Sequence, residues 1–474
     1  TPVATFGLDR IHDELHYIAH MMKKHSPDVH HMIIADPNFA MFKRDMQVCE
    51  SIREVQDLTG WPRFIGCSTG KNQPDRILDA VSKLQPNSLR ISNSMQSMNP
   101  ETLVAIKRSN IDLGGYQKVQ TEILRRGLRS MGDIILSLPE ETRDTHFSAI
   151  RNMIDSGIQE FTSYQAMILK STELELESAR GKFGIKTKWR LVPRAVGQYA
   201  MLGEEIHTAE VEEIATWTDT LSEEDYFAAR RLHLTTMIFH NSQLFDMVHQ
   251  ILKDNDIKIS DFIVKCYERS TEADFPLREV FEAFIDETRA ELFATREECY
   301  SFYVDPDAQE RISQGEIGNN LLFRYLSTAL VQNWDESVKV VVDALEDFGV
   351  CDDTELEDLR EIHLAMVADI SVRPIVREER LRIRSEKSIE NLAKSYPSLD
   401  LDLKAGDEVV MSLEQTRYEM LLGVTTLYPN NPMGWALALC QGRIHLVARV
   451  PKRAQMSSHL VRRTNVCELK RAEG

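Results

Sequence analysis

The 474-residue sequence has no long hydrophobic run, and its apolar stretches fall short of the roughly 20 residues that span a bilayer. Its N-terminal stretch, TPVATFGLDRIHDELHYIAH, has neither the basic start nor the apolar core of a secretory signal. Positive charge is scarce: 56 Lys and Arg stand against 74 Asp and Glu, a net charge of −18. Because phosphate contacts need a basic surface, this composition disfavours a nucleic-acid or anionic-membrane partner.

Closely spaced cysteines are also missing. The seven cysteines are scattered, at positions 49, 67, 266, 299, 351, 440 and 467. No two are close enough to form a C-x-x-C metal clip. An odd number of separate thiols suits a reducing compartment better than a disulfide framework. We therefore expect a cytoplasmic protein whose cysteines are mostly small buried side chains.

From residue 9 to about 170, helix-like and strand-like segments alternate along the chain. The expected strands are 30–36, 64–68, 88–92, 133–139 and 160–169, and the expected helices are 9–24, 42–58, 77–84, 100–108, 115–126 and 143–156. Such alternation predicts an α/β fold of parallel strands joined by crossovers. An open doubly wound sheet and a full or partial (β/α) TIM-like barrel both fit, and in either one ligands bind where the strands end.

The remaining sequence suggests two further regions. From residue 204 a helical period dominates, beginning with EVEEIATWTD (210–219), and 359–392 reads as one charged amphipathic helix. We predict three domains: an α/β barrel-like domain over 1–200, a helical domain over 201–360, and an amphipathic helix with a small α+β module over 361–474. The basic C-terminal end, Arg443 to Arg471, we interpret as a solvated tail.

Polar side chains gather where the expected strands end. Asp36 and Asn38 follow the first strand, Ser94 and Gln96 follow the third, and Asp133 opens the fourth. An amide can both donate to and accept from a ribose diol, and an arginine such as Arg108 offers a fork for a carboxylate. In the turn after the fourth strand, Leu138 and Pro139 could form a wall for a flat ring. Together these residues predict a pocket for a zwitterionic, ribose-containing ligand.

Four segments resemble the radical S-adenosylmethionine (SAM) superfamily, in the branch with cobalamin-dependent enzymes, methylthiotransferases and oxygen-independent coproporphyrinogen oxidases. They are ADPNF (35–39), MQSMNPETLVAIKR (95–108), GDIILSLPEET (132–142) and LKSTELE (169–175). The resemblance implies that Gln96 contacts the SAM ribose, Arg108 its carboxylate and Asp133 another SAM group. It also implies that Asp36 and Asn38 meet the methionine end. Ser137, Lys170 and Ser171 depart from the family's glycine and proline residues at these turns.

The largest departure is the missing C-x3-C-x2-C loop, whose thiolates hold a [4Fe–4S] cluster in this family. The chain begins with Thr, at the helix that would follow that loop, so we expect a truncated radical SAM enzyme that is inactive as given. The family's chemistry implies reductive SAM cleavage to a 5′-deoxyadenosyl radical, an electron donor such as flavodoxin or ferredoxin, and a small-molecule or glycan/lipid-linked substrate. The resemblance also allows cobalamin as a further cofactor.

Two alternatives remain at this point. A cluster-less, non-catalytic SAM-binding or protein-interaction module would lack the cysteines naturally. An ordinary phosphate-binding barrel would need a glycine-rich loop after its late strands, and SLPEET and LKSTEL do not supply one.

Histidines cluster near the start of the chain. His12, His16 and His20 recur every four residues along one helix face, with His25, His30 and His31 nearby. A metal site would need a further ligand, and no carboxylate or cysteine stands at a matching spacing. We therefore interpret this face as a polar helix surface and predict no metal.

Overall fold

A computed structural model describes residues 5–453, apart from 28, 37, 70–72, 87, 93, 109–112, 202, 397–402 and 440–443, and without the side chains of 433, 437, 444, 445 and 453. Cys440, Cys467 and the basic residues from Arg462 onward therefore lie outside the described residues. The chain divides into two compact units. The first contains 1–241, 258–264 and 285–311, and the second contains 242–257, 265–284 and 312–474. The three-domain division at 200 and 360 stays a prediction.

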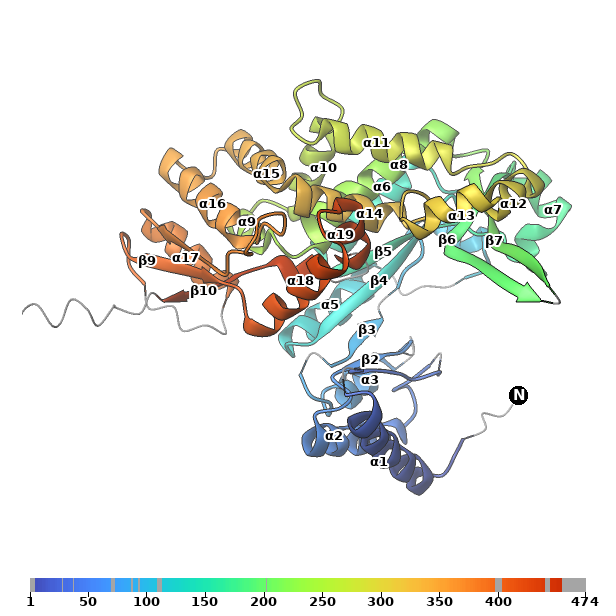
Figure 1. Ribbon diagram of the computed structural model, residues 1–474, viewed down its shortest axis with the longest axis horizontal. Helices are drawn as coiled ribbons and strands as arrows, with labels where there is room; N and C mark the ends of the chain where they lie inside the picture. The colour runs from blue at the N-terminus through green and yellow to red at the C-terminus, as the bar shows by residue number, and fades with distance from the viewer. Residues whose placement is uncertain are drawn as a thin grey trace, which may run out of the picture. The chain divides into compact units, whose positions relative to one another are not determined.

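The first unit begins with alternating helices and parallel strands. They are α1 (Leu8–His25), β1 (His31–Ile33), α2 (Asp45–Thr59), β2 (Phe64–Gly66), α3 (Pro74–Val81), β3 (Arg90–Ser92), α4 (Pro100–Ala105), α5 (Leu113–Arg125), β4 (Arg129–Leu136), α6 (Arg143–Asp155) and β5 (Glu160–Gln165). β1 pairs with β2, and β4 lies between β3 and β5, in every case in parallel. A parallel bridge between Ile65 and Leu89 joins the two groups. The strands thus follow one another in chain order, and the expected α/β class with parallel strands is confirmed (Figure 1).

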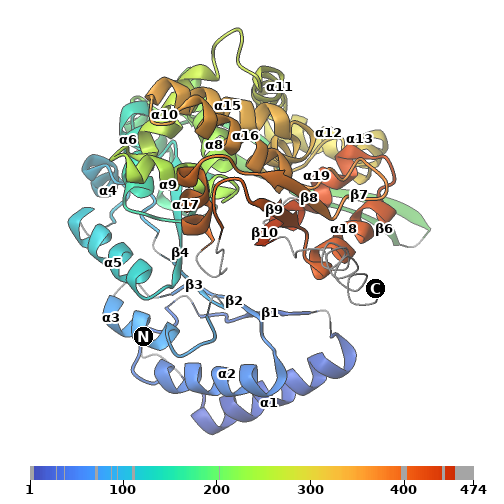
Figure 2. The ribbon, with the colours of Figure 1, turned by 90° about the vertical axis from the view of Figure 1, so that its left-hand side faces the viewer.

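A hydrophobic core holds the N-terminal helices against these strands. α1 contributes Leu15, α2 contributes Ile52 and α3 contributes Leu78, all buried with the strand residues Ile65 and Ile91. In Figure 2, α1 and α2 lie side by side along β1 and β2. The helical spacing of apolar residues on each helix explains the packing, because such a stripe is removed from water only against another apolar face.

The first unit continues with a long antiparallel hairpin. After η1 (Glu173–Glu175) and α7 (Glu177–Phe183), β6 (Lys186–Met201) pairs with β7 (Glu204–Trp217). The helix predicted for 210–219 is therefore wrong. Val211, Ile214 and Ala215 have helical spacing, but pairing with β6 brings Glu212 to Arg190 across the ladder, an arrangement that sequence spacing does not show.

Helices complete the first unit. α8 (Glu223–Thr236) and η2 (Met237–Asn241) follow the hairpin, and the unit also holds the start of α10 (Ile259–Arg269), the end of α11 (Arg278–Ala290), α12 (Arg296–Val304) and most of α13 (Pro306–Ser313). Ser222 caps α8 by accepting from the Asp225 N–H, while Asp225 accepts from the Ser222 N–H.

The second unit is mainly helical with a small sheet. Its elements are α9 (Asp246–Asp254), α14 (Leu321–Ser327), η3 (Thr328–Gln332), α15 (Trp334–Phe348), α16 (Asp353–Met366), β8 (Glu378–Arg382), α17 (Glu386–Ser395), β9 (Glu408–Ser412), α18 (Gln415–Leu427), α19 (Pro432–Leu439), η4 (Ile444–Val447) and β10 (Val450–Arg453). β9 lies between β8 and β10 in an antiparallel sheet. The single helix predicted for 359–392 is wrong: α16 ends at Met366, and strand β8 separates it from α17. The Arg373–Pro374 bond lies in this gap, where proline removes a helical donor.

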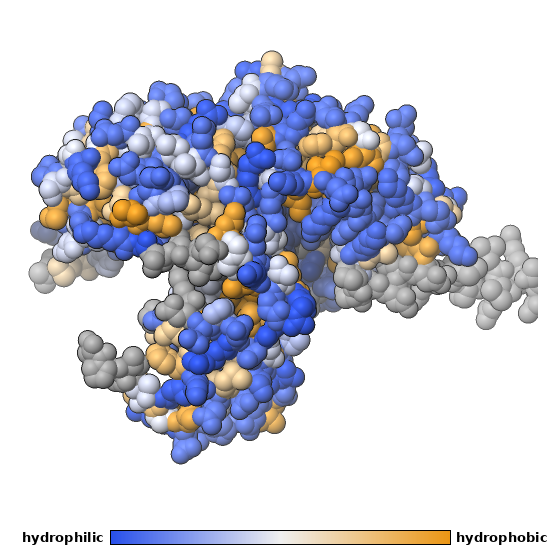
Figure 3. Space-filling view, turned by 180° about the vertical axis from the view of Figure 1, so that it is seen from behind, coloured by the Kyte–Doolittle hydropathy of each residue, from blue (hydrophilic) through white to orange (hydrophobic). Residues whose placement is uncertain are grey.

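Within the described residues, no helix is both long and apolar enough to cross a membrane. The face in Figure 3 is mostly hydrophilic, with hydrophobic residues in separate patches.

Candidate functional site

A row of polar side chains crosses the parallel strands of the first unit, at or just beyond the C-terminal ends of β2 and β3 and in the middle of β4. The Thr69 hydroxyl accepts from the Ser92 N–H at 3.0 Å, and the Ser92 and Ser94 hydroxyl oxygens are 3.2 Å apart. The Ser94 hydroxyl in turn donates to Asp133 Oδ2 at 2.6 Å. These hydrogen bonds connect the segments that follow β2 and β3 to β4, and two of the predicted site residues, Ser94 and Asp133, are in direct contact.

Gln96 lies beside the same part of the sheet. Its N–H donates to the Asp133 carbonyl at 2.9 Å, and its own carbonyl accepts from the Ile135 N–H at 2.8 Å. Its φ of 60° lies in the left-handed region, which non-glycine residues seldom adopt. The chain after β3 thus stays hydrogen-bonded to β4 and holds Gln96 in a fixed, strained backbone conformation. Such conformations persist where the surrounding structure imposes them and are common in binding sites.

Asp133 lies in the middle of β4 and does not open the strand as predicted, because β4 begins four residues earlier, at Arg129. Its carboxylate influences the neighbouring strand. Burial raises the pKa of the Tyr164 hydroxyl on β5, and the negative charge of Asp133 raises it further. Tyr164 therefore stays protonated beside this carboxylate at neutral pH and can serve as a hydrogen-bond donor.

Asp36 and Asn38 lie in the loop after β1. Asp36 Oδ1 accepts from the Asn38 N–H at 2.8 Å, which closes a local turn. The loop remains in line with the sheet, since Phe39 forms a parallel bridge with Thr69, the first residue of the polar row. Asp36 and Asn38 are thus placed at the same edge as that row.

Arg108 was predicted to lie in the helix that follows the third strand. That helix, α4, ends at Ala105, so Arg108 lies outside it. The residue is exposed, and its backbone N–H donates to the Leu103 carbonyl at 2.9 Å. The segment that follows, 109–112, is outside the described residues. The structure therefore does not bring the Arg108 side chain into contact with Ser94, Gln96 or Asp133.

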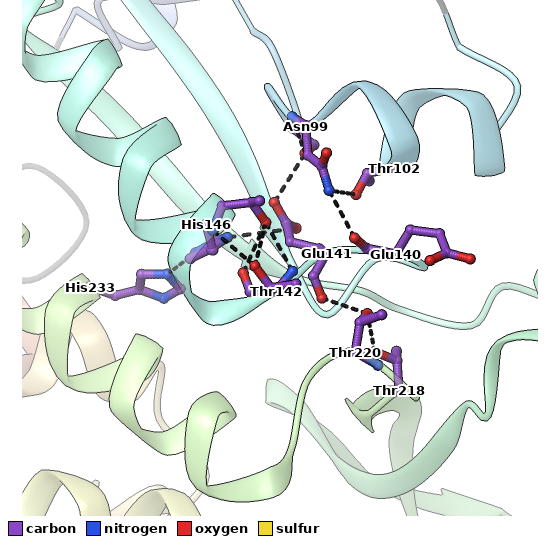
Figure 4. Close-up of polar contacts among 11 residues, drawn as sticks. Asn99, Thr102, Glu140, Glu141, Thr142, His146, Thr218, Thr220 and His233 are labelled. Carbon is purple, nitrogen blue, oxygen red and sulfur yellow. Dashed lines mark hydrogen bonds and ion pairs between the residues drawn. The ribbon is translucent and has the colours of Figure 1, made fainter.

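The turn after β4 contains Leu138 and Pro139, which are both buried. Ser137 and Glu140 flank them with φ values of 66° and 63°. Asn99, the residue before α4, holds this turn: its side-chain amide donates to the Glu140 carbonyl at 2.8 Å and to the Thr102 hydroxyl at 3.0 Å (Figure 4). The SLPEET turn and the start of α4 are thereby fixed to each other.

Behind this turn lies a buried chain of ionisable groups that the sequence did not reveal. Glu141 is fully buried and accepts from the Ser97 hydroxyl at 3.0 Å, and its other oxygen is 3.7 Å from His146 Nδ1. His146 Nε2 is 2.8 Å from His233 Nε2 on α8 (Figure 4). The pKa of His233 is held well below 6.5, mainly because the ring is buried, and the neighbouring His146 and Arg230 lower this pKa further. His233 is therefore neutral at physiological pH.

This chain of side chains connects α6 and α8 to the turn. Thr220, just before α8, also donates to the Glu141 carbonyl at 2.8 Å. No sequence signal could have found the arrangement, since Glu141 and His146 are five residues apart and His233 is 87 residues further along.

A second cluster of charged groups, partly buried and also unforeseen, lies on the β6–β7 hairpin. Arg190 on β6 is paired with Glu212 at 2.7 Å and with Glu291 at 3.3 Å. Burial alone would lower the pKa of Arg190, but these carboxylates more than offset it, so the guanidinium stays charged. Tyr226 of α8 donates to Gln165, the last residue of β5.

A cavity of about 900 Å³ lies at a different place from the predicted site residues. It is lined by α4, by Glu140 of the turn and by the segment from Thr172 to Phe183, and it contains neither Gln96 nor Asp133. The Lys107 ammonium at its rim pairs with Glu173 at 2.7 Å. The wall of the cavity thus includes α4 and Glu140, which the Asn99 side chain holds together.

The cysteines do not fit an iron–sulfur cluster in the described part of the chain. Burial raises the pKa of Cys49, Cys67 and Cys299 to about 12, and it raises the pKa of Cys351 to about 11. The pKa of buried Cys266 is likewise raised. The family's cluster needs three thiolates from one C-x3-C-x2-C loop, whereas these five cysteines are at least 18 residues apart in the sequence.

No family model matches the chain, but two curated proteins do. It is 29% identical over 185 residues to a cobalamin-dependent radical SAM methyltransferase, TokK, of Streptomyces tokunonensis, over 38% of this chain and 26% of that protein. It is 24% identical over 388 residues to a 2-(S-pantetheinyl)-carbapenam-3-carboxylate methyltransferase of Streptantibioticus cattleyicolor, over 78% of this chain and 53% of that protein.

Among solved structures, the radical SAM methyltransferase TsrM from Kitasatospora setae aligns with a TM-score of 0.31 and 13% identity, over 41% of this chain and 36% of that chain. The chain spans about a quarter and about half of the lengths of the two curated relatives.

The four motif segments and the curated relatives define a class of SAM-dependent radical proteins. Within it, the chain is similar to proteins of the cobalamin-dependent branch of the radical SAM superfamily.

Proposed function

We propose that the first unit binds SAM along the polar row formed by Thr69, Ser92, Ser94 and Asp133. The observation that carries this proposal is the contact of Ser94 with Asp133, together with the hydrogen bonds that fix Gln96 beside them. Thr69, Ser92 and Ser94 lie at or just beyond the C-terminal ends of β2 and β3, the ends where α/β folds bind their ligands. The strands follow one another in chain order, which supports a partial (β/α) TIM-like barrel.

In this proposal each side chain has a distinct part in binding. Gln96 forms hydrogen bonds with the ribose hydroxyls. Asp133, positioned by Ser94, accepts a hydrogen bond from a hydroxyl or from the ammonium of SAM. The Arg108 side chain reorients to pair with the carboxylate of SAM. Asp36 and Asn38 shape the methionine end, and Leu138 with Pro139 forms an apolar wall for the adenine. A guanidinium can pair with a carboxylate through two parallel hydrogen bonds, which makes Arg108 the residue that fixes orientation.

The complete enzyme, we infer, transfers a methyl group to a small molecule. The names of the two curated relatives, both methyltransferases, support this inference. A [4Fe–4S] cluster supplies the electron that cleaves SAM in such enzymes, and cobalamin carries the methyl group. Because the described cysteines do not fit a cluster, no redox step is assigned to the residues of this chain. A flavodoxin or ferredoxin would be the electron donor.

The test is SAM affinity of the 474-residue chain by isothermal titration calorimetry. We expect Gln96→Ala and Asp133→Asn each to weaken SAM binding about tenfold, the loss of roughly one good hydrogen bond. Arg108→Ala should weaken it about 10–100-fold, since its bond is charge-assisted.

Gln117→Ala and Arg63→Ala are matched controls, because both residues are exposed. Unchanged affinity in the three site variants would show that SAM binds elsewhere. If the unmodified chain bound no SAM at all, the proposed function of the first unit would be wrong.

A further inference from the structure

A group of metal-ligand side chains lies on the N-terminal helices, away from the polar row. His12 and His16 are one turn apart on α1, and Glu54 faces them from α2. His12 Nε2 is 3.4 Å from Glu54 Oε2, and His16 Nε2 is 3.7 Å from Glu54 Oε1. All three ligand atoms lie within 4.8 Å of one another. The sequence could not show this set, because the carboxylate comes from another helix.

These distances suit one shared cation. With metal–nitrogen and metal–oxygen bonds of about 2.0–2.2 Å, a tetrahedral zinc ion spaces its ligand atoms about 3.3–3.6 Å apart. The two histidine–Glu54 distances, each to a different carboxylate oxygen, come close to that spacing before any side chain moves. The two imidazole rings are also close, with centroids 4.4 Å apart.

The orientation of both rings favours a metal over a simple ion pair. Nε2 of His16 is buried and has no hydrogen-bond partner among the described residues. His12 Nδ1 is 3.5 Å from Asp13 Oδ1, a carboxylate that can accept a hydrogen bond from Nδ1–H and so leave the unprotonated Nε2 as the ligand atom. Metal-binding histidines are usually oriented by such an outer partner.

The helices hold the three ligands on a rigid frame. Leu15 and Ala19 of α1 are buried in the same core as Ile52 and Val55 of α2, and these residues flank the ligands in sequence. Sites built on packed helices keep their geometry better than sites on loops. The part of the molecule that carries α1 and α2 is largely hydrophilic on the face in Figure 3.

We propose that His12, His16 and Glu54 bind a divalent cation of the zinc type and brace α1 against α2. Two imidazoles and one carboxylate are a donor set that zinc accepts, with water at the fourth position, whereas magnesium and calcium prefer oxygen ligands. This site is independent of SAM binding.

The test is titration of the metal-stripped 474-residue chain with Co²⁺, read by its visible absorption, followed by displacement with Zn²⁺. We expect a spectrum of four- or five-coordinate cobalt that Zn²⁺ abolishes at one equivalent. His12→Ala, His16→Ala and Glu54→Gln should each weaken Zn²⁺ binding about tenfold or more. Mutating even a residue that only hydrogen-bonds to a metal ligand weakens metal affinity by that much. Zn²⁺ should also raise the melting temperature of the chain but not of Glu54→Gln.

Two matched controls share the same helices. His20→Ala removes an exposed histidine one turn further along α1, and Glu50→Gln removes a carboxylate one turn before Glu54 that pairs with Lys83. Both should bind Zn²⁺ like the unmodified chain. Because Glu54 and His12 are partly exposed, their variants should fold even if His16→Ala does not. Equal Zn²⁺ affinity in Glu54→Gln and the unmodified chain would overturn the proposal.

Discussion

The Ser94–Asp133 contact illustrates how one residue pair can serve both stability and binding. The hydroxyl donates at 2.6 Å to a carboxylate in the middle of a strand, and Ser94 itself is almost fully buried. Hydrogen bonds to charged groups contribute more than neutral ones, because the charge strengthens the bond. The same hydroxyl keeps the carboxylate in position for a ligand.

We predict that Ser94→Ala lowers the free energy of unfolding by about 1–2 kcal/mol, since Asp133 keeps its charge but loses its donor. Ser148→Ala, at an exposed position on α6, should change it by less than about 0.5 kcal/mol. Urea unfolding of both variants gives the comparison. Equal stability of the two variants would mean that water replaces the hydroxyl without loss.

His363 provides a pH-dependent prediction at the same scale. Burial lowers its pKa from 6.5 to about 4, although the hydrogen bond to the Leu359 carbonyl opposes the shift. The ring is stacked on Phe245, with centroids 5.5 Å apart. As the pH falls below 6.5, His363 is protonated in the unfolded chain but stays neutral in the folded chain. The free energy of unfolding therefore decreases between pH 6.5 and pH 4.

From this shift we expect His363 to account for about 2 kcal/mol of the stability lost between pH 7 and pH 5. In His363→Phe, which can keep the aromatic stack, that loss should be smaller by this amount. His20→Phe, at an exposed position, should leave it unchanged. The measurement is the urea midpoint of the second unit at the two pH values. A pH dependence identical to that of the unmodified chain would show that His363 is protonated without cost.

At the scale of elements, Asn99 joins a helix start to a turn. Its side-chain oxygen accepts from the Glu101 N–H at 3.3 Å, while its amide donates to Thr102 and to the Glu140 carbonyl. Asn99→Asp keeps the cap but loses both donated bonds and sets a carboxylate against a carbonyl. We expect this change to cost about 2 kcal/mol in the free energy of unfolding.

Asn320 provides the matched control, because it caps α14 by accepting from the Phe323 N–H and is exposed. Asn320→Asp should lie within about 0.5 kcal/mol of the unmodified chain, since Asp and Asn are equally good caps. If Asn99→Asp were equally mild, the turn after β4 would be held by other contacts.

The elements also show what the sequence could predict. Buried parallel strands and amphipathic helices have distinct periods, so the alternation up to β5 was predicted correctly in kind, with errors at the ends. Because of those errors, Asp133 was predicted at the start of its strand but lies in the middle of it. Arg108 was predicted inside its helix but lies beyond the end of it. The β6–β7 hairpin was missed because its charged residues resemble a helix face. Glu141, His146 and Glu54 were missed because their partners are brought close only by folding.

At the scale of the whole molecule, the two units are interleaved along the chain. The first unit is completed by 258–264 and 285–311, which return after the chain has entered the second. The returning segments make specific contacts. Trp189 and Phe293 exchange backbone hydrogen bonds at 2.8 and 2.9 Å. Glu291 pairs with the partly buried Arg190, and the His207 ring is 2.9 Å from Gln309 Oε1.

We therefore predict that a fragment of residues 1–311 keeps a cooperatively unfolding first unit, whereas residues 1–241 do not. In the shorter fragment, the backbone of β6 at Trp189 loses its hydrogen-bond partner at the strand edge. Arg190 also loses the carboxylate of Glu291, and removing one partner of a charge that is shielded from water lowers the free energy of unfolding. Both fragments contain the same three tryptophans, at 61, 189 and 217, so their fluorescence in urea can be compared directly. Proteolysis should cut the β6–β7 hairpin early in the shorter fragment only. A sharp unfolding transition at the same urea concentration in both would mean that the returning segments are dispensable, and that the first unit ends at residue 241.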